Sequence, residues 1–195
     1  MVKLYCFDFD GTLTTKDTMF LFLKFYNKKQ YYRQFLKFLP LFILLKMGLL
    51  KAEQVKESFI ASLLKGESQE KLKHASEKFY ELNAEIILRP NAKRFISQMH
   101  EEGHSGVIVS ASLNIWLEPF ARQLNLDLIC TQAQFVDNKF SGKFSTPNCT
   151  QQEKVVRLKR YLDGKRFDRL IAFGDSSGDL PMLEYSNEGH YKYFH

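Results

Sequence analysis

Three short apolar runs, each ending in polar residues, dominate the hydrophobic pattern of the chain. They cover residues 2–9, 106–110 and 169–173, and helical stretches lie between them. Nearly continuous apolar runs of this length are typical of strands buried on both faces, as in parallel sheets. The pattern therefore predicts an α/β fold with a doubly wound parallel sheet.

Sequence patterns typical of helices and of one hairpin lie outside these three runs. Helical patterns cover the stretches 91–102, 114–124 and 150–162. The last of these opens with Thr150 and Glu153, which fit a capping box. Residues 133–144 predict a β-hairpin that turns at Asp137 and Asn138.

The stretch from residue 15 to residue 88 differs from the rest of the chain. It contains several helical segments and no convincing strand. We interpret it as an all-helical cap inserted after the first strand. The predicted division is a catalytic core of residues 1–14 and 89–195 and a cap of residues 15–88.

Positive charge is concentrated in this cap. Residues 18–66 contain nine lysines and arginines but only two acidic residues, so they carry +7, against −1 for the remainder. The same stretch holds an apolar run, residues 38–45, which is too short to span a bilayer. Such a segment either lies on an anionic membrane surface or forms the core of the cap, and both readings stay open. Because there is no recognition helix or stacking motif, nucleic acid is not an expected partner.

Cysteine usage and the start of the first strand bear on location. The three cysteines are Cys6, Cys130 and Cys149, which are far apart and form no Cys-x-x-Cys pair. This pattern favours a reducing compartment over a disulfide framework or a thiolate zinc site. The first strand begins at Val2, which leaves no room for a signal peptide ahead of it. We therefore expect a cytoplasmic protein, either free or peripheral at the cytoplasmic face of the membrane.

Groups suited to phosphate chemistry follow all three predicted strands. The three motifs are Asp8-Phe9-Asp10-Gly11-Thr12, Ser110-Ala111-Ser112 and Gly174-Asp175-Ser176-Ser177-Gly178-Asp179. Ligands of open parallel sheets bind at the carboxyl ends of the strands, so these motifs should meet at one edge. Lys154, near the start of a predicted helix, should join them.

The residue types fit phosphoryl transfer from a phosphomonoester. Asp8 is the expected nucleophile, which would form an aspartyl phosphate. Asp10 is placed to protonate the leaving alkoxide and later to activate water. A carboxylate can attack a phosphate anion only if their repulsion is offset, and Mg²⁺ held by Asp175 would do so.

The remaining motif residues have supporting roles in this reading. Ser110, together with Ala111, is expected to bind the phosphate oxygens, although Ser112 stays an alternative to Ser110 as the main donor. Lys154 would balance the negative charge of the intermediate. Asp179 would support the metal site and orient Lys154.

Two other motif readings are weaker. Gly174 to Gly178 fits the Gly-x-Ser-x-Gly nucleophile elbow, but only a short tail follows it, whereas the acid and histidine of that fold lie downstream. The Asp8-x-Asp10 pattern hints at a calcium loop, but Met19 occupies the twelfth position, where a glutamate is needed.

The motifs together resemble the four signature motifs of the haloacid dehalogenase superfamily. They are Asp8 to Thr14, Ser110, Lys154 and Gly174 to Asp179, in the order that the superfamily has them. The resemblance implies a Rossmann-like core, Mg²⁺ dependence and an aspartyl-phosphate intermediate. It also implies metal contacts from the Asp8 carboxylate, the Asp10 backbone carbonyl and the Asp175 side chain. Dehalogenating members lack the second aspartate, so Asp10 points to a phosphatase.

A helical cap in this position is similar to that of the subfamily that includes phosphoserine phosphatase. Asp17 lies where those enzymes carry a glutamate that reads the substrate amine. They also use a cap arginine, but residues 35–87 contain none. The basic, apolar segment is more similar to the cap of the phosphatidylglycerophosphatase C group, which implies a lipid head-group phosphate as substrate. The alternatives are a soluble metabolite phosphatase or phosphotransferase and, less favoured, a membrane-binding protein without activity.

Overall fold

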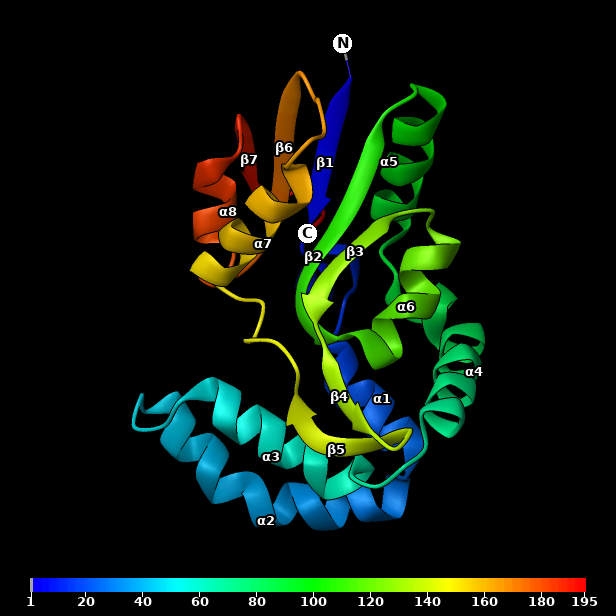
Figure 1. Ribbon diagram of the computed structural model, residues 1–195, viewed down its shortest axis with the longest axis vertical. Helices are drawn as coiled ribbons and strands as arrows, with labels where there is room; N and C mark the ends of the chain where they lie inside the picture. Colours follow the sequence, from blue (N-terminus) through cyan, green and yellow to red (C-terminus); the bar gives the residue numbers. More distant parts are fainter. Residues whose placement is uncertain (1) are drawn as a thin grey trace.

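The computed structural model, which describes residues 2–195, has a five-stranded parallel sheet at its centre (Figure 1). The strand order is β3-β2-β1-β6-β7, and every neighbouring pair is parallel. The strands are β1 (Lys3–Phe7), β2 (Ser105–Leu113), β3 (Asp127–Thr131), β6 (Arg169–Gly174) and β7 (Glu188–Tyr191). The predicted doubly wound α/β fold is confirmed, and β3 and β7 add to the three predicted strands.

Helices cover both faces of this sheet, and the alternation of side chains along β1 shows why. Tyr5 and Phe7 belong to one apolar core, whereas Leu4 and Cys6 belong to the other. The first core includes side chains of α5 (Pro90–Glu101) and α6 (Asn114–Gln123). The second includes side chains of α7 (Gln152–Leu162) and α8 (Leu180–Tyr185).

The predicted capping box at Thr150 does not form. Helix α7 begins at Gln152, one residue later than an N-cap at Thr150 predicts, and its N-cap Gln151 makes no side-chain capping bond. Gln151 takes a left-handed backbone conformation, with φ of 50°, and its N–H donates to the carbonyl of Gly178 at 2.8 Å. A long-range backbone bond has therefore replaced the local cap.

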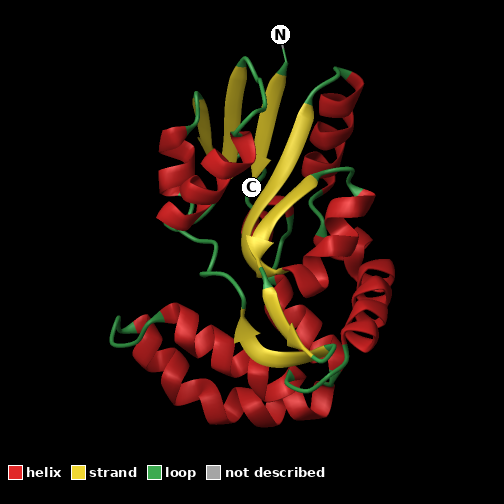
Figure 2. Ribbon diagram, viewed as in Figure 1, coloured by secondary structure: helices red, strands yellow, loops and turns green. Residues whose placement is uncertain are grey.

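The predicted hairpin forms β4 (Ala133–Val136) and β5 (Lys139–Phe144). Asp137 and Asn138 turn the chain with φ of 50° and 59°, as the hairpin turn requires. The hairpin lies beside the helices of the cap rather than on the main sheet (Figure 2). Phe140 and the segment Gly66–Glu67 exchange two backbone hydrogen bonds there, of 2.8 and 2.9 Å.

Residues 15–88 form four helices that lie beyond the carboxyl ends of β1 and β2 (Figure 1). These are α1 (Thr18–Tyr26), α2 (Lys28–Lys46), α3 (Ala52–Leu64) and α4 (Gln69–Ile87). Where the chain enters and leaves them, Thr14 pairs with Leu88 in an antiparallel bridge. Arg89 N also donates to Leu13 O at 2.9 Å. The division into a core and a cap stays a prediction, and this paired entry and exit coincides with its boundary.

The apolar run of residues 38–45 has two faces in α2. Phe38 and Phe42 pack edge-to-face against the buried ring of Phe59 on α3, so one face is core of the cap. The opposite face is exposed, and Ile43, for example, has 54% of its surface accessible. Other exposed apolar side chains of this region are Leu36, Leu39, Leu41, Leu44, Met47 and Leu49. One face of the run is therefore core of the cap, and contact with a membrane stays a prediction for the exposed face.

Within residues 2–195, every helix falls short of the length or apolar character that crossing a bilayer demands.

Candidate active site

Asp8 stands at the carboxyl end of β1, inside the protein. Its backbone N–H donates to Phe173 O on β6 at 2.9 Å, which fixes its position at the edge of the sheet. The residue is only 7% exposed. Its Oδ1 accepts a hydrogen bond from Lys154 Nζ at 2.6 Å and its Oδ2 accepts one from Thr12 Oγ1 at 3.1 Å. Both partners are residues that the sequence predicted for the site.

The turn after β1 brings Asp8 and Asp175 together. Thr12 Oγ1, which donates to Asp8, also lies 3.3 Å from Asp175 Oδ1. The turn depends on Gly11, whose φ of +87° disfavours any side chain. A Cβ at Gly11 would lie 2.3 Å from Asp175 Oδ2. Only glycine therefore lets the backbone approach Asp175 this closely.

Lys154 and Asp179 form a second buried pair beside Asp8. Lys154 Nζ lies 2.6 Å from Asp179 Oδ1, and both residues are 1% exposed. Although burial opposes the effect, Asp8 and Asp179 raise the pKa of Lys154, which stays charged. Asp179 Oδ2 accepts from the N–H and the hydroxyl of Ser176 at 2.9 and 2.8 Å. Asp179 is therefore in contact with Lys154, and its role in orienting that side chain stays a prediction.

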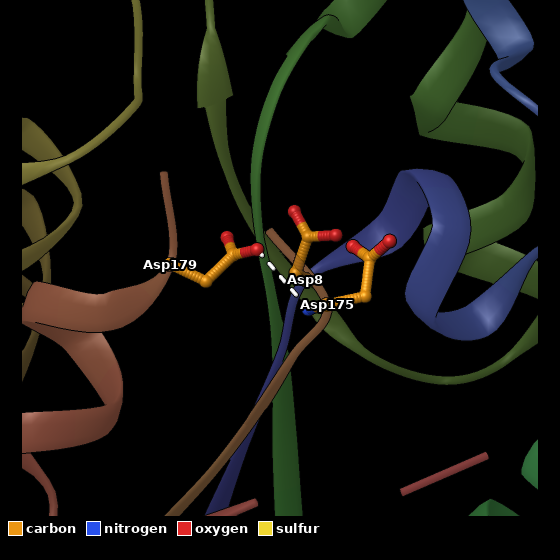
Figure 3. Close-up of side chains that lie close together, drawn as sticks. All are labelled: Asp8, Asp175 and Asp179. Atoms are coloured by element: carbon orange, nitrogen blue, oxygen red, sulfur yellow. Dashed lines mark hydrogen bonds between the residues drawn. The ribbon is translucent and has the colours of Figure 1, made fainter. Parts of the chain in front are cut away.

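Three carboxylates gather at this point, those of Asp8, Asp175 and Asp179 (Figure 3). One oxygen of each lies within 4.8 Å of the others. Burial raises the pKa of Asp8 to about 7 against the effect of Lys154, and Asp179 and Asp10 add to the rise. Burial also raises the pKa of Asp175. The single ammonium of Lys154 does not balance three carboxylates, so the cluster has the charge and the donor set for a divalent cation.

Asp10 is held by hydroxyl groups from both the cap and the core. Its Oδ1 accepts from the N–H and the hydroxyl of Thr18, both at 2.6 Å. Its Oδ2 accepts from Ser112 Oγ at 2.5 Å. Thr18 is the first residue of α1, and sequence reasoning did not select it, because nothing in a lone threonine at a helix start signals this contact.

Ser110 and Ser112 have different roles in the structure. The hydroxyl of Ser112 is used by Asp10, whereas Ser110 Oγ accepts the N–H of Ser112 at 3.0 Å. Among residues 2–195 the O–H of Ser110 has no acceptor, so it is left to donate into the cavity. This arrangement favours Ser110 as the phosphate donor.

A cavity of about 150 Å³ lies between these groups. All the predicted site residues except Thr12 and Asp175 line it, and Lys56 of α3 reaches in from the cap. Lys56 Nζ donates to Ala111 O at 2.7 Å. Burial lowers the pKa of Lys56, and Asp10 and Asp17 oppose that effect. A larger cleft of about 480 Å³ between β3 and α7 contains none of the predicted residues.

Asp17 lines the cavity but also has a structural task. Its carboxylate caps α1, accepting from Met19 N at 2.9 Å and from Phe20 N at 3.4 Å. Because the N-cap role accounts for one oxygen, the other is the part of Asp17 left for a substrate.

The comparison with known families agrees with this geometry. The family model for haloacid dehalogenase-like hydrolases matches residues 6–184. The chain belongs to this family. The match spans β1 to α8, so it includes every residue of the predicted site.

Three similar proteins bear on which haloacid dehalogenase-like activity this chain has. Protein CicA of Caulobacter vibrioides is 34% identical over 98% of this chain and 86% of its own length. Phosphoserine phosphatase of Streptococcus thermophilus is 25% identical over 57% of this chain and 53% of its own length. A protein of unknown function from Bordetella pertussis Tohama I has a TM-score of 0.83 at 24% identity, covering 95% of this chain and 87% of that one. The chain is therefore a phosphatase of the haloacid dehalogenase-like family.

Proposed function

We propose that the protein is a Mg²⁺-dependent phosphomonoester hydrolase that works through an aspartyl phosphate on Asp8. The observation that carries the proposal is the position of Asp8, which lies between the ammonium of Lys154 and the carboxylate of Asp175. Asp10, Ser110 and Lys154 line the same cavity, so an acid, a hydroxyl donor and a cation surround the nucleophile.

Asp8 and Asp175 are the side chains that fit Mg²⁺. Asp179 is committed to Lys154 and Ser176, whereas within residues 2–195 the Asp175 carboxylate contacts only the Thr12 hydroxyl, which it shares with Asp8. The backbone carbonyl of Asp10 is the third protein ligand that we propose. A bound Mg²⁺ would offset the repulsion between Asp8 and the phosphate and stabilise the charge on the transferring phosphoryl group.

In the first half-reaction a carboxylate oxygen of Asp8 attacks phosphorus, and the bond from phosphorus to the alcohol oxygen breaks. Asp10 gives its proton to the departing oxygen, so that a neutral alcohol leaves. Ser110 and Lys154 donate to the phosphoryl oxygens while charge builds on them. Asp8 then carries the phosphoryl group.

In the second half-reaction water attacks the same phosphorus atom and the bond to Asp8 breaks. Asp10, now a carboxylate, takes the proton of that water. Thr18 and Ser112 hold Asp10 in place, since hydroxyl groups can donate to its carboxylate or accept from its protonated form. Inorganic phosphate leaves, and Asp8 is a free carboxylate again.

Phosphate release from p-nitrophenyl phosphate, with and without Mg²⁺, tests this chemistry. We expect activity that EDTA abolishes and Mg²⁺ restores. Asp8→Asn should abolish turnover, whereas Asp10→Asn should accumulate protein that is heavier by one phosphoryl group. Retained turnover in folded Asp8→Asn protein would overturn the mechanism.

For the substrate we propose a lipid head-group phosphate, reached at the cytoplasmic face of an anionic membrane. The exposed apolar side chains of α2 lie among lysines and an arginine, a combination that fits anionic lipid. Helix α3, which follows this segment at Ala52, packs against α2 through Phe59 and carries Lys56 into the cavity. Three buried free cysteines, Cys6, Cys130 and Cys149, fit a reducing compartment.

The alternative is a soluble phosphomonoester, which the similarity to phosphoserine phosphatase favours. Phosphatidylglycerol phosphate in mixed micelles, phosphoserine and other small phosphomonoesters, assayed side by side, distinguish the two. A kcat/KM at least tenfold higher for the lipid supports the membrane proposal. A higher kcat/KM for a small ester would favour the soluble substrate and would mean that the exposed α2 surface does not serve to reach a lipid substrate.

A further inference from the structure

Three charged side chains on one face of α3 hold backbone groups of the core. Glu53, Lys56 and Glu57 are spaced at i, i+3 and i+4, so they share that face. Glu53 accepts from Asn148 N at 2.9 Å, and Glu57 accepts from Phe144 N at 2.9 Å. Lys56 differs from both, because its contact is with the phosphate-binding segment that ends β2.

The bond from Lys56 Nζ to Ala111 O acts on a peptide group that also carries the N–H of Ser112. In a trans peptide the carbonyl and the N–H lie in one plane and point in opposite directions within it. Thr131 Oγ1 donates to the same carbonyl at 2.9 Å, so the plane is fixed from this side by two bonds. The N–H of Ser112 is thereby directed at Ser110 Oγ, 3.0 Å away.

This chain of bonds reaches the hydroxyl that faces the substrate. Because Ser110 Oγ accepts from Ser112 N, its own hydrogen is left to point elsewhere, into the cavity. A cation on the carbonyl end of a peptide also polarises the group and strengthens the N–H as a donor at the other end. Lys56 therefore influences Ser110 without touching it.

We infer that Lys56 of the cap is a positioning residue for Ser110 of the core, acting through the Ala111–Ser112 peptide. The inference rests on the proposed role of Ser110 as a phosphate donor. It assigns to the cap a part in binding the phosphoryl group itself, in addition to choosing the substrate.

A double-mutant cycle between Lys56→Met and Ser110→Ala tests this, with p-nitrophenyl phosphate as substrate and inorganic phosphate as competitive inhibitor. Removing one such donor should lower kcat/KM about 100-fold in Ser110→Ala, and we expect about tenfold in Lys56→Met. If Lys56 acts through Ser110, adding Lys56→Met to Ser110→Ala should cost less than about twofold more. The inhibition constant for phosphate should show the same pattern.

Glu57→Ala is the matched control, because it loosens the same helix face without acting on this peptide. In the double variant with Ser110→Ala, the fold-loss in kcat/KM caused by Glu57→Ala should multiply with that caused by Ser110→Ala. Lys56→Gln, which keeps an N–H donor without the charge, should fall between the wild type and Lys56→Met, and it replaces Lys56→Met if the latter does not fold. If the fold-losses in kcat/KM of Lys56→Met and Ser110→Ala multiply in the double variant, the two residues act independently and the inference is overturned. An unchanged activity in Ser110→Ala would instead overturn the proposed role of Ser110.

Discussion

Lys154 Nζ lies 2.6 Å from Asp8 Oδ1, and the same ammonium lies 2.6 Å from Asp179 Oδ1. The nucleophile proposed here is therefore held by a cation that is itself held by a second carboxylate, and all three residues are buried. Such a buried group keeps its charge only while its partners are in place, so removing any member should affect the others.

Replacing Lys154 with methionine should lower kcat/KM about 100-fold or more. Lys154 is the one protein cation within reach of the Asp8 carboxylate in the described chain, and its loss leaves Asp8 and Asp179 repelling one another. Steady-state kinetics with p-nitrophenyl phosphate measure the loss. Lys159→Met, at an exposed position of the same helix, is the control and should stay within about twofold of the wild type. Near-normal turnover in folded Lys154→Met protein would contradict the assigned role.

Asp8→Asn should stabilise the metal-free protein at neutral and higher pH. Burial raises the pKa of Asp8 to about 7, above the usual value of 3.8. The folded protein therefore binds a proton that the unfolded chain has lost, and stability falls as the pH rises between these values. Asparagine does not ionise, so Asp8→Asn does not lose this stability as the pH rises. Thermal unfolding in EDTA at pH 8 should show a midpoint at least about 3 °C higher for Asp8→Asn, and no difference near pH 3.

The same comparison in Mg²⁺ supplies the control for that prediction. A bound cation would favour the ionised form of Asp8, so Mg²⁺ should stabilise the wild type and remove the advantage of Asp8→Asn. A wild type that is more stable than Asp8→Asn in EDTA at pH 8 would show that Lys154 outweighs the burial of Asp8.

Gly11→Ala should weaken the response to Mg²⁺. A Cβ at this position would lie 2.3 Å from Asp175 Oδ2, so Asp175 or the turn must move. We expect the Mg²⁺ concentration for half-maximal activity to rise about tenfold or more, as when a supporting contact of a metal ligand is lost. Gly103→Ala is matched in backbone, with φ of +76°, but nothing lies within 4 Å of its Cβ. Gly103→Ala should lose about 1–2 kcal/mol of stability from the same backbone effect as Gly11→Ala. Its Mg²⁺ concentration for half-maximal activity should stay that of the wild type.

Polar substitutions on the exposed face of α2 and the loop after it should release the protein from anionic vesicles. The combined variant carries serine at Leu36, Ile43, Met47 and Leu49, which are between 54% and 69% exposed. Because burial of apolar side chains drives interfacial binding, partition should fall about tenfold or more. Co-sedimentation with vesicles that contain phosphatidylglycerol measures it, at low and high salt. Serine at Leu82 and Ile86, exposed on α4, is the control and should have no effect.

The strands and the chemistry at their ends could be predicted because both depend on local patterns. The run that became β1 is buried on both faces, and the motif residues after it need only a sheet edge to converge. The resemblance to the family rested on the four motifs together, in their order along the chain. Fold class, helices α5 and α6 and the β4–β5 hairpin followed from the same kind of signal.

Contacts between distant segments could not be predicted in this way. The start of α7 was wrong because Gln151 bonds to Gly178, a partner that no local propensity reveals. Thr18 and Lys56 were missed because they lie on cap helices whose docking on the core depends on tertiary packing. The apolar run of α2 was ambiguous for the same reason, since Phe59 decides which of its side chains are buried.

The bridge between Thr14 and Leu88 has a consequence for how such enzymes diversify. Since the two ends of the insertion are neighbours, the core imposes the same closure distance on an insert of any length. A gene can therefore lengthen, shorten or exchange this loop in one recombination event without displacing Asp8, provided that the new insert supplies Asp10 with a donor in place of Thr18. The nucleophile would be inherited with the sheet, whereas an exchanged insert would change the range of substrates and also the contacts that Thr18 and Lys56 make with the core.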